Sequence, residues 1–216
     1  MFINFWYPMA LAKDITADKP TRAQVFGLPF VVFRDQSGQA RVLADTCVHR
    51  GGSLSKGLIK NGNAVCPYHG WEFGGDGKCS KVPSLGEVTK IPARAKVDAY
   101  PVQEKYGLVF VFLGDLPEEQ RPPIMEIAEW DDPGWRCTTL GFSLRANYAR
   151  VVENALDPAH AEFVHFVGRK GQDPDYQMPD YQTQESEWGA GMEVRFRTQA
   201  GGLFRYFRPG DTETIA

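Results

Sequence analysis

The chain of 216 residues has no long hydrophobic run. Its longest uninterrupted apolar segment, Leu108–Leu113, is far shorter than the roughly 20 residues that a membrane-spanning helix needs, so we expect no membrane span. Residues 1–12 lack the basic start of a secretory signal and contain Pro8. Charge of one sign is not in large excess either. The formal net charge is −3, so we expect no general attraction to nucleic acid or to an anionic membrane.

Cysteine and histidine are also scarce, with four of each in the whole chain. Two cysteines and two histidines fall within residues 47–69, and the other two histidines fall within residues 160–165. Cys79 and Cys137 lie apart from both groups, and we expect them to be reduced, partly buried thiols. This use of cysteine is typical of a reducing compartment, and we expect the cytoplasm.

The first group has an alternating order: Cys47 and His49 stand two residues apart, and Cys66 and His69 follow after a spacer. A structural zinc site usually pairs cysteine with cysteine and histidine with histidine. The alternation favours a two-iron cluster with unlike ends, in which Cys47 and Cys66 hold one iron while His49 and His69 hold the other. This is the Rieske form of a [2Fe-2S] centre. On the residues alone, a zinc site of irregular order and ordinary buried side chains stay open as alternatives.

The second group lies in a segment, residues 149–166, that looks helical with a break near Asp157 and Pro158. His160 and His165 are five residues apart, which places them about 140° apart on a straight helix. They could share a metal only if the helix broke or flared. A pair of histidines on a partly buried helix is the alternative. Asp157 followed by proline is also typical of a helix start, with Asp as the N-cap and Pro in the first helical position.

Short β-rich segments separated by turns fill the rest of the chain. A small antiparallel barrel or sandwich is therefore expected for the N-terminal half. The expected strands are residues 24–26, 30–34, 41–44, 71–73, 78–82, 97–102 and 108–113, with turns at 35–38, 61–62 and 74–77. Beyond them, residues 136–148 look extended, 168–180 look like a loop, and 192–198 and 203–207 alternate like strands.

From about residue 5 to residue 115 the chain resembles Rieske proteins. In the respiratory members two further cysteines form a disulfide beside the cluster, but the matching positions here are Gly52 and Tyr68. Trp71 stands where those proteins carry a serine. The pattern therefore resembles the oxygenase and ferredoxin type, at the low end of a range of potentials that starts at about −150 mV.

The pattern Glu-Asn-x2-Asp-x2-His-x4-His at residues 153–165 is similar to that of the α subunits of Rieske non-haem iron oxygenases. The resemblance implies that His160 and His165 bind a mononuclear Fe(II), that Asp157 is the catalytic carboxylate linking the two metal centres, and that Asn154 is a polar neighbour. The opening Asn-Phe-Trp-Tyr-Pro-Met-Ala and the stretch Cys-Pro-Tyr-His-Gly-Trp-Glu-Phe look most similar to vanillate and dicamba demethylases and to pheophorbide a oxygenase.

The fold implied is α+β. We expect a small antiparallel β Rieske [2Fe-2S] domain over residues 1–115, a linker over 116–135, and the N-terminal part of a helix-grip catalytic domain over 136–216. A non-haem Fe(II) oxygenase site also needs a carboxylate. In the family that ligand lies well beyond the second histidine, so we expect it beyond residue 216 and the chain to be truncated at its C-terminus.

The function implied is that of an oxygenase component. Electrons pass from the Rieske [2Fe-2S] cluster to Fe(II) for O2-dependent hydroxylation or demethylation of a small organic, aromatic substrate, as in aromatic compound catabolism. No Gly-x-Gly-x-x-Gly fingerprint is present, so we expect an NAD(P)H-dependent reductase, a ferredoxin or both as partners. The family resemblance implies a homotrimer for the full-length protein. The alternative is a Rieske electron-transfer protein without substrate chemistry of its own, which would need residues 1–115 alone.

Overall fold

A computed structural model describes residues 3–86, 90–157, 159–165, 180–187, 189–198 and 212–215. The chain divides into two compact units, Met1–Cys137 and Thr138–Ala216, and each is described by itself. The expectation of an α+β chain with antiparallel strands is confirmed, because every strand pair in both units is antiparallel. Within the described residues, no helix has the length and apolar character to cross a bilayer.

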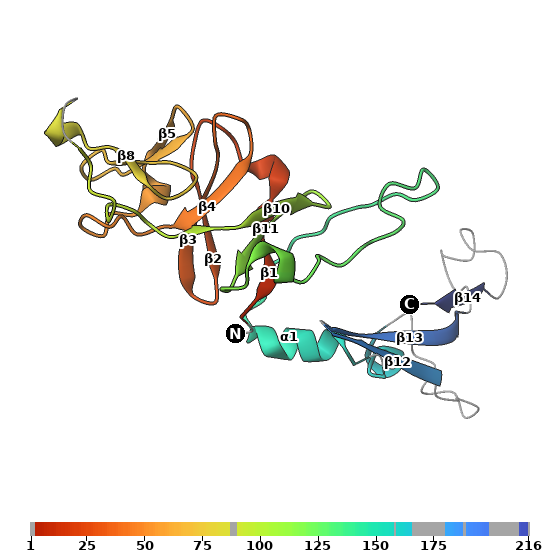
Figure 1. Cartoon of the computed structure of the whole chain (residues 1–216). Helices are drawn as coiled ribbons and strands as arrows, with labels where there is room; N and C mark the ends of the chain where they lie inside the picture. The colour runs from red at the N-terminus through yellow and green to blue at the C-terminus, as the bar shows by residue number, and fades with distance from the viewer. Residues whose placement is uncertain are drawn as a thin grey trace. The chain divides into compact units, whose positions relative to one another are not determined.

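The first unit consists of three small antiparallel sheets (Figure 1). Its first sheet has the order β1-β11-β10, its second β2-β3-β4-β9, and its third β5-β6-β7-β8. The strands are β1 (Phe5–Leu11), β2 (Thr21–Val25), β3 (Leu28–Arg34), β4 (Ala40–Ala44), β5 (Leu58–Lys60), β6 (Asn63–Val65), β7 (Glu72–Phe73), β8 (Cys79–Lys81), β9 (Ala99–Tyr100), β10 (Val102–Lys105) and β11 (Leu108–Leu113). Four short 3-10 helices join them: η1 (Ala12–Asp14), η2 (Leu54–Lys56), η3 (Pro83–Leu85) and η4 (Glu118–Gln120).

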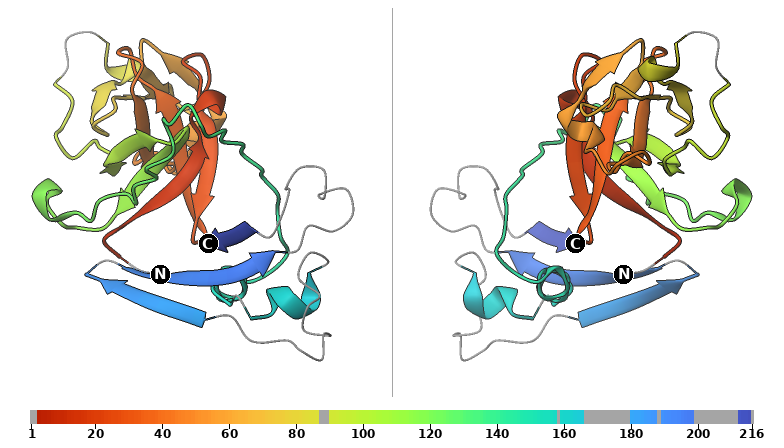
Figure 2. Two further views of the ribbon diagram at one scale, coloured as in Figure 1. Left: turned by 90° about the vertical axis from the view of Figure 1, so that its right-hand side faces the viewer. Right: turned by 90° about the vertical axis from the view of Figure 1, so that its left-hand side faces the viewer.

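The N-terminal aromatic segment is itself a strand. β1 pairs with β11, near the other end of the unit's sequence, with Trp6 opposite Phe112. Figure 2 shows the unit from two further sides, with the orange and yellow segments that carry residues 47–81 gathered at one end. That end contains the third sheet and both predicted loops of metal ligands.

Strand β3 has apolar side chains on both faces, because four consecutive residues, Phe30 to Phe33, are fully buried. Successive side chains of a strand point to opposite sides. Val31 and Phe33 accordingly pack in the core that contains Cys47 and Cys66, while Phe30 and Val32 pack in the core shared with β11. β3 is therefore the common wall of two hydrophobic cores.

The expected hairpin turn at Asn61 and Gly62 is present between β5 and β6, and both residues have positive φ, as a two-residue hairpin turn of this kind requires. A Cβ on Gly62 would lie 2.2 Å from the backbone nitrogen of Gln36. The third sheet thus rests against the turn between β3 and β4, and only glycine fits at that contact.

The predicted linker, residues 116–135, lies against the first unit. Trp6 Nε1 donates to the carbonyl of Pro122 at 2.8 Å, and the backbone N–H of Ile127 donates to the Tyr106 hydroxyl at 2.7 Å. The Tyr106 and Trp130 rings also pack together, with centroids 5.1 Å apart. Pro122, Ile127 and Trp130 of this segment therefore pack against the rest of the unit, while residues 131–135 are exposed.

The second unit contains α1 (Tyr148–Ala155), α2 (Ala161–Val164) and a sheet of β12 (Asp180–Ser186), β13 (Gly189–Thr198) and β14 (Thr212–Ile215). Asn147 caps α1, since its side chain accepts from the N–H of Ala149 at 2.9 Å. The prediction of a broken helix over 149–166 is confirmed by the gap between α1 and α2. Residues 136–146 form no strand, and α1 already begins at Tyr148, where we had expected extended chain.

The expected strand 192–198 is the second part of β13. The expected strand 203–207 lies outside the described residues, as does nearly all of the expected loop 168–180. Cys79 is buried as expected, but Cys137 is exposed, which corrects the expectation that both thiols are partly buried. Its neighbours in residues 136–146 have no strand partner and are exposed as well.

Candidate metal centres

Two loops of matching geometry carry the first four predicted ligands. In the first, the N–H of Cys47 donates to Gly52 O and the N–H of Gly51 donates to Cys47 O, both at 2.9 Å. In the second, the N–H of Cys66 donates to Trp71 O at 2.8 Å and the N–H of Gly70 donates to Cys66 O at 3.0 Å. Gly51 and Gly70 both have φ +71°. Each loop is thus a tight turn that begins at a cysteine and needs glycine four residues later.

The two loops also contact each other closely. A Cβ on Gly52 of the first loop would lie 2.8 Å from Cys66 Sγ and 3.3 Å from Tyr68 Cβ of the second. The absence of a side chain at Gly52 is what lets the loops approach. On the other side of the second loop, Gly70 lies under Pro83 of η3, since a Cβ there would meet Pro83 Cγ at 3.1 Å.

The two cysteines face the protein interior. Cys47 is 3% exposed and Cys66 is 2% exposed, in a core with Leu54 and Phe73. Burial raises the pKa of the Cys47 thiol to about 11, and the neighbouring Cys66 thiol adds to the rise. Since metals bind thiolates, loading this pair would release protons.

The two histidines face outward from the same loops. The His49 and His69 rings lie against each other, with centroids 4.5 Å apart. Partial desolvation lowers the pKa of His49, and the neighbouring His69 and Arg50 lower it further. A low pKa favours the neutral imidazole, which is the form that binds metals.

Aromatic rings hold both imidazoles. Trp71 stacks on His49, with centroids 4.6 Å apart and an angle of 3° between the planes. Tyr68 packs on His69 at 4.0 Å. Sequence reasoning noted Trp71 only as a replacement for serine and missed this stacking. The available signal was that Trp71 follows the second histidine directly after a turn glycine.

The donor set fits a Rieske cluster. Two buried thiols and two outward imidazoles come from loops that touch, and such a cluster takes two protein ligands on each iron. In the part of the chain that the structure describes, no three His, Cys, Asp or Glu side chains surround one point as a single-ion site would require. A cluster held in pairs does not need such a group.

The second predicted site lies at the two ends of α2. His160 precedes this helix and His165 follows it, and their ring centroids are 5.3 Å apart. Because α2 has only four residues and both histidines lie outside it, the 140° separation expected on a straight helix does not apply. The two histidines that the pattern predicted as iron ligands are neighbours in the structure.

Asp157 contacts the first of these histidines. One carboxylate oxygen accepts from the N–H of Ala159 at 3.0 Å, and the other lies 3.6 Å from His160 Nδ1. His160 Nδ1 also contacts the carbonyl oxygen of Asp157. The expectation that a helix starts directly after Asp157 is wrong, because α2 begins at Ala161 and its first turn bonds to the carbonyl of His160. Asp157 caps the turn before the helix.

Comparisons with known proteins agree with both sites. Residues 5–101 match the family described as the Rieske [2Fe-2S] domain, and residues 144–215 match the vanillate O-demethylase oxygenase C-terminal domain. The chain therefore joins a Rieske [2Fe-2S] domain to a C-terminal domain of the vanillate O-demethylase oxygenase type. The predicted fold, a Rieske domain followed by part of an oxygenase catalytic domain, is thereby confirmed, as is the resemblance to the branch containing vanillate demethylase.

Three proteins that are similar to this chain illustrate the range. Chlorophyllide a oxygenase of Chlamydomonas reinhardtii is 39% identical over 171 residues, which cover 75% of this chain and 24% of that protein. An oxygenase component of 3-ketosteroid-9-alpha-monooxygenase from Rhodococcus rhodochrous is 33% identical over 188 residues, covering 83% of this chain and 45% of that protein. The structure of dicamba monooxygenase with non-heme iron and dicamba matches with a TM-score of 0.71 and 27% identity, over 94% of this chain and 56% of that one.

The chain thus spans 24% of the first of these curated relatives and 45% of the second. Both predicted cofactors are confirmed as those of the family, the cluster by the Rieske domain match and the iron by the dicamba monooxygenase structure. The assignment of individual ligands, Cys47, His49, Cys66, His69, His160 and His165, stays a prediction that rests on the geometry above.

Proposed function

We propose that this protein is the oxygenase component of a Rieske system. Cys47, His49, Cys66 and His69 hold a [2Fe-2S] cluster, and His160 and His165 hold a mononuclear Fe(II). The reaction is O2-dependent hydroxylation or demethylation of an organic, aromatic substrate. The observation that carries this proposal is that one chain contains both donor sets, each already brought together: interlocking loops for the cluster, and paired imidazoles 5.3 Å apart for the iron.

The residues have separate roles in this proposal. When bound, the cluster supplies one-electron transfer and the iron supplies O2 activation. The buried thiols of Cys47 and Cys66 keep water from one end of the cluster site, while the exposed imidazoles of His49 and His69 are the route by which electrons enter and leave. Asp157 orients the ring of His160 through Nδ1 and leaves the other ring nitrogen for the metal.

We further propose that the electrons come from an NAD(P)H-dependent reductase, directly or through a ferredoxin. Relatives are named oxygenase components, which implies further components in those systems. We also propose that the full-length protein is a homotrimer and lies in the cytoplasm. The proposed domain bounds are residues 1–115, 116–135 and 136–216. Cys79 and Cys137, the two cysteines outside the cluster loops, form no disulfide, which supports a reducing compartment.

The candidate substrate classes come from the proteins that this chain resembles. Relatives are named for chlorophyllide a and for 3-ketosteroids, and a solved relative holds dicamba. These three classes of ring compound are the first substrates to test. A Rieske electron carrier would need no residues beyond the first unit, whereas here residues 144–215 match an oxygenase domain.

The first experiment tests the cluster. The purified chain should be red-brown when oxidised. After reduction with dithionite, it should give the EPR spectrum of a cluster with nitrogen ligands. His49→Cys or His69→Cys should move that spectrum toward an all-thiolate cluster. Cys137→Ser, which removes an exposed thiol outside the loops, is the control and should change nothing. Colourless protein with stoichiometric zinc would overturn the assignment.

The second experiment tests the reaction. Protein isolated from its native host is reduced, mixed with O2 and one substrate of each class, and assayed for product and for cluster oxidation. His160→Ala and His165→Ala should retain a reducible cluster but form no product. Arg150→Gln, an exposed side chain on α1, is the control and should behave as the unaltered protein. Product formation by both histidine variants would exclude the proposed iron site.

A further inference from the structure

One buried carboxylate has no part in the reaction proposed above. Asp45 is 4% exposed and lies at the end of β4, two residues before Cys47. Burying a carboxylate is costly unless hydrogen bonds compensate for the lost water. The partners that Asp45 finds are therefore informative about its role.

The close partners of the Asp45 carboxylate all lie just beyond the first ligand loop. One carboxylate oxygen accepts from the backbone N–H of Ser55 at 2.6 Å. The other accepts from the hydroxyls of Ser53 at 2.7 Å and Ser55 at 2.9 Å. Arg22 Nε lies 3.9 Å from this second oxygen, with a mostly exposed side chain. The short contacts thus all lead to residues 53–55.

The backbone makes the same connection. The N–H of Leu54 donates to the carbonyl of Asp45 at 2.8 Å, and Thr46 forms a β-bridge with Ser53. The loop between these anchors contains Cys47, His49 and Gly52. Its two ends are therefore joined at Asp45 by both backbone and side-chain hydrogen bonds.

The far end of this loop, residues 52–54, contacts both the second ligand loop and the core, so its placement affects both. Gly52 stands directly before Ser53, and its Cα is so near the second loop that a Cβ would lie 2.8 Å from Cys66 Sγ. Leu54, directly after Ser53, is fully buried in the core that contains both cysteines. A shift of residues 52–54 would move the contact between the two ligand loops.

We propose that Asp45 is a positioning residue for the cluster. It fixes the ends of the first ligand loop and thereby sets the placement of Cys47 and His49 relative to Cys66 and His69. The proposal rests on the cluster assignment given under Proposed function. Groups that orient metal ligands from behind commonly change metal affinity by 10- to 100-fold when they are removed.

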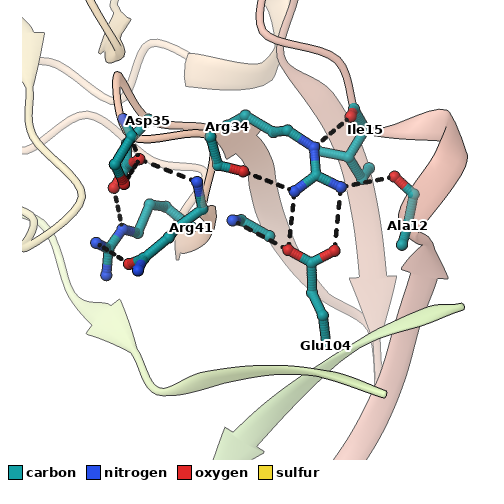
Figure 3. Close-up of polar contacts among 10 residues, drawn as sticks. Ala12, Ile15, Arg34, Asp35, Arg41 and Glu104 are labelled. Atoms are coloured by element: carbon teal, nitrogen blue, oxygen red, sulfur yellow. Dashed lines mark hydrogen bonds and ion pairs between the residues drawn. The ribbon is translucent and has the colours of Figure 1, made fainter. Parts of the chain in front are cut away.

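Asp35 provides a matched control (Figure 3). Its carboxylate also collects several donors in a turn: the N–H and hydroxyl of Ser37 at 2.9 and 2.6 Å, the N–H of Gln39 at 3.1 Å and Arg41 Nε at 2.6 Å. This turn joins β3 to β4 and carries no predicted metal ligand. Asp35 therefore resembles Asp45 in the hydrogen bonds that its carboxylate accepts, but it does not adjoin a loop of predicted metal ligands.

The experiment compares Asp45→Ala, Asp45→Asn and Asp35→Ala, each measured for melting temperature, for the EPR line shape of the reduced cluster, and for the rate at which visible colour is lost. Asp45→Ala should lose the cluster about tenfold faster than the unaltered protein does. Its EPR spectrum should show shifted g-values or broadened lines. Asp45→Asn should recover most of both, because an amide can still accept from the Ser55 N–H and pair with the serine hydroxyls. Asp35→Ala should lower the melting temperature but leave the EPR spectrum unchanged.

A third variant covers the case in which Asp45→Ala does not fold. The double change Ser53→Ala and Ser55→Ala removes both hydroxyl donors while keeping the buried carboxylate and its backbone partner. This double variant should show the same change in the EPR spectrum as Asp45→Ala, but to a smaller extent. If neither Asp45→Ala nor the double variant changes the EPR spectrum or the rate of colour loss, the positioning role is wrong, while a nitrogen-ligated spectrum in the unaltered protein keeps the cluster assignment. Absence of that spectrum in the unaltered protein overturns the cluster assignment itself.

Discussion

The indole of Trp71 lies flat on the imidazole of His49, with ring centroids 4.6 Å apart and only 3° between the planes. Trp71 comes from the second ligand loop and His49 from the first, so this stack joins the two loops outside the buried thiols. It restricts rotation of a ring whose nitrogen is predicted to hold iron. Aromatic pairs of this kind contribute roughly 0.5–1.5 kcal/mol beyond the area they bury.

Trp71→Leu should therefore release His49 while Trp71→Phe should retain a stacked ring. For the leucine variant we expect a loss of about 1 kcal/mol or more in the free energy of unfolding and an altered EPR spectrum of the reduced cluster. The phenylalanine variant should keep the spectrum. Trp6→Leu is the control, because Trp6 packs on Phe112 in the first sheet. A changed spectrum in the Trp6 variant, or none in Trp71→Leu, would contradict the role given to the stack.

Gly52→Ala should separate the two ligand loops. The new Cβ would lie 2.8 Å from Cys66 Sγ, and a thiol placed there for a metal cannot move aside without losing its position. We expect poor cluster incorporation, measured as iron and sulfide per chain. Gly141→Ala is the matched control, since a Cβ at Gly141 meets nothing within 4 Å. Full incorporation in the Gly52 variant would show that the loops can part and still hold the cluster.

Arg34 is expected to be the most important cation for the stability of the first unit. Its guanidinium donates to both carboxylate oxygens of Glu104, at 2.8 and 3.1 Å, and to the carbonyls of Ala12 and Ile15, each at 2.9 Å (Figure 3). Arg34→Ala would remove a donor from each of those carbonyls and leave Glu104 without its partner, at a cost of about 1–3 kcal/mol. Urea unfolding at neutral pH measures this loss. Asp76→Asn, which breaks the exposed pair with Lys78, should cost far less.

The same pair predicts a pH dependence. The hydrogen bond from Arg34 is the largest cause that holds the pKa of Glu104 below its usual 4.5. A carboxyl with a lowered pKa in the folded protein stabilises it above the unfolded pKa and loses that effect as pH falls through the folded value. The unaltered protein should thus exceed Glu104→Gln in stability at pH 6, and the difference should shrink as pH falls below about 4.5. A difference that stays constant over this range would contradict the ionised pair.

Asp157 is predicted to have two separable roles. Asn is about as good a cap as Asp, so Asp157→Asn should still accept from the N–H of Ala159 and leave stability nearly unchanged. It should lose the charge that orients His160 and slow electron transfer between the two centres in single-turnover experiments. Asp157→Ala should lose both roles, and the loss of the hydrogen bond from the Ala159 N–H should cost about 0.5–1.5 kcal/mol. Normal turnover by the Asn variant would leave Asp157 as a cap alone.

The metal-ligand candidates could be predicted because the members of each pair lie within a few residues of each other in the sequence. Cys47 and His49, and Cys66 and His69, lie close together in sequence, so their order and spacing alone suggested the donor set, which the structure brings together in two touching loops. The helix break before His160 was likewise visible as an Asp-Pro step. Turn residues such as Asn61 and Gly62 determined the hairpin for the same reason.

What could not be predicted depends on contacts between distant segments. The stacking of Trp71 on His49 requires the two loops to interlock, and no spacing in either loop encodes that contact. The partners of Asp45 follow eight and ten residues later, and only the folded loop brings them back to it. The start of α2 at Ala161 was missed because capping residues mark a turn as readily as a helix.

The two-faced burial of β3 has a consequence for how the protein is made. Val31 and Phe33 belong to the core beside the ligand cysteines, whereas Phe30 and Val32 belong to the core beside β11. Neither core can form without the strand, so their opening is expected to be one cooperative event. Iron and sulfide must then be delivered to a scaffold in which β1 at the start of the unit and β11 near its end are already paired. We therefore expect that translation passes residue 113 before the loop of Cys47 is held in place for the cluster.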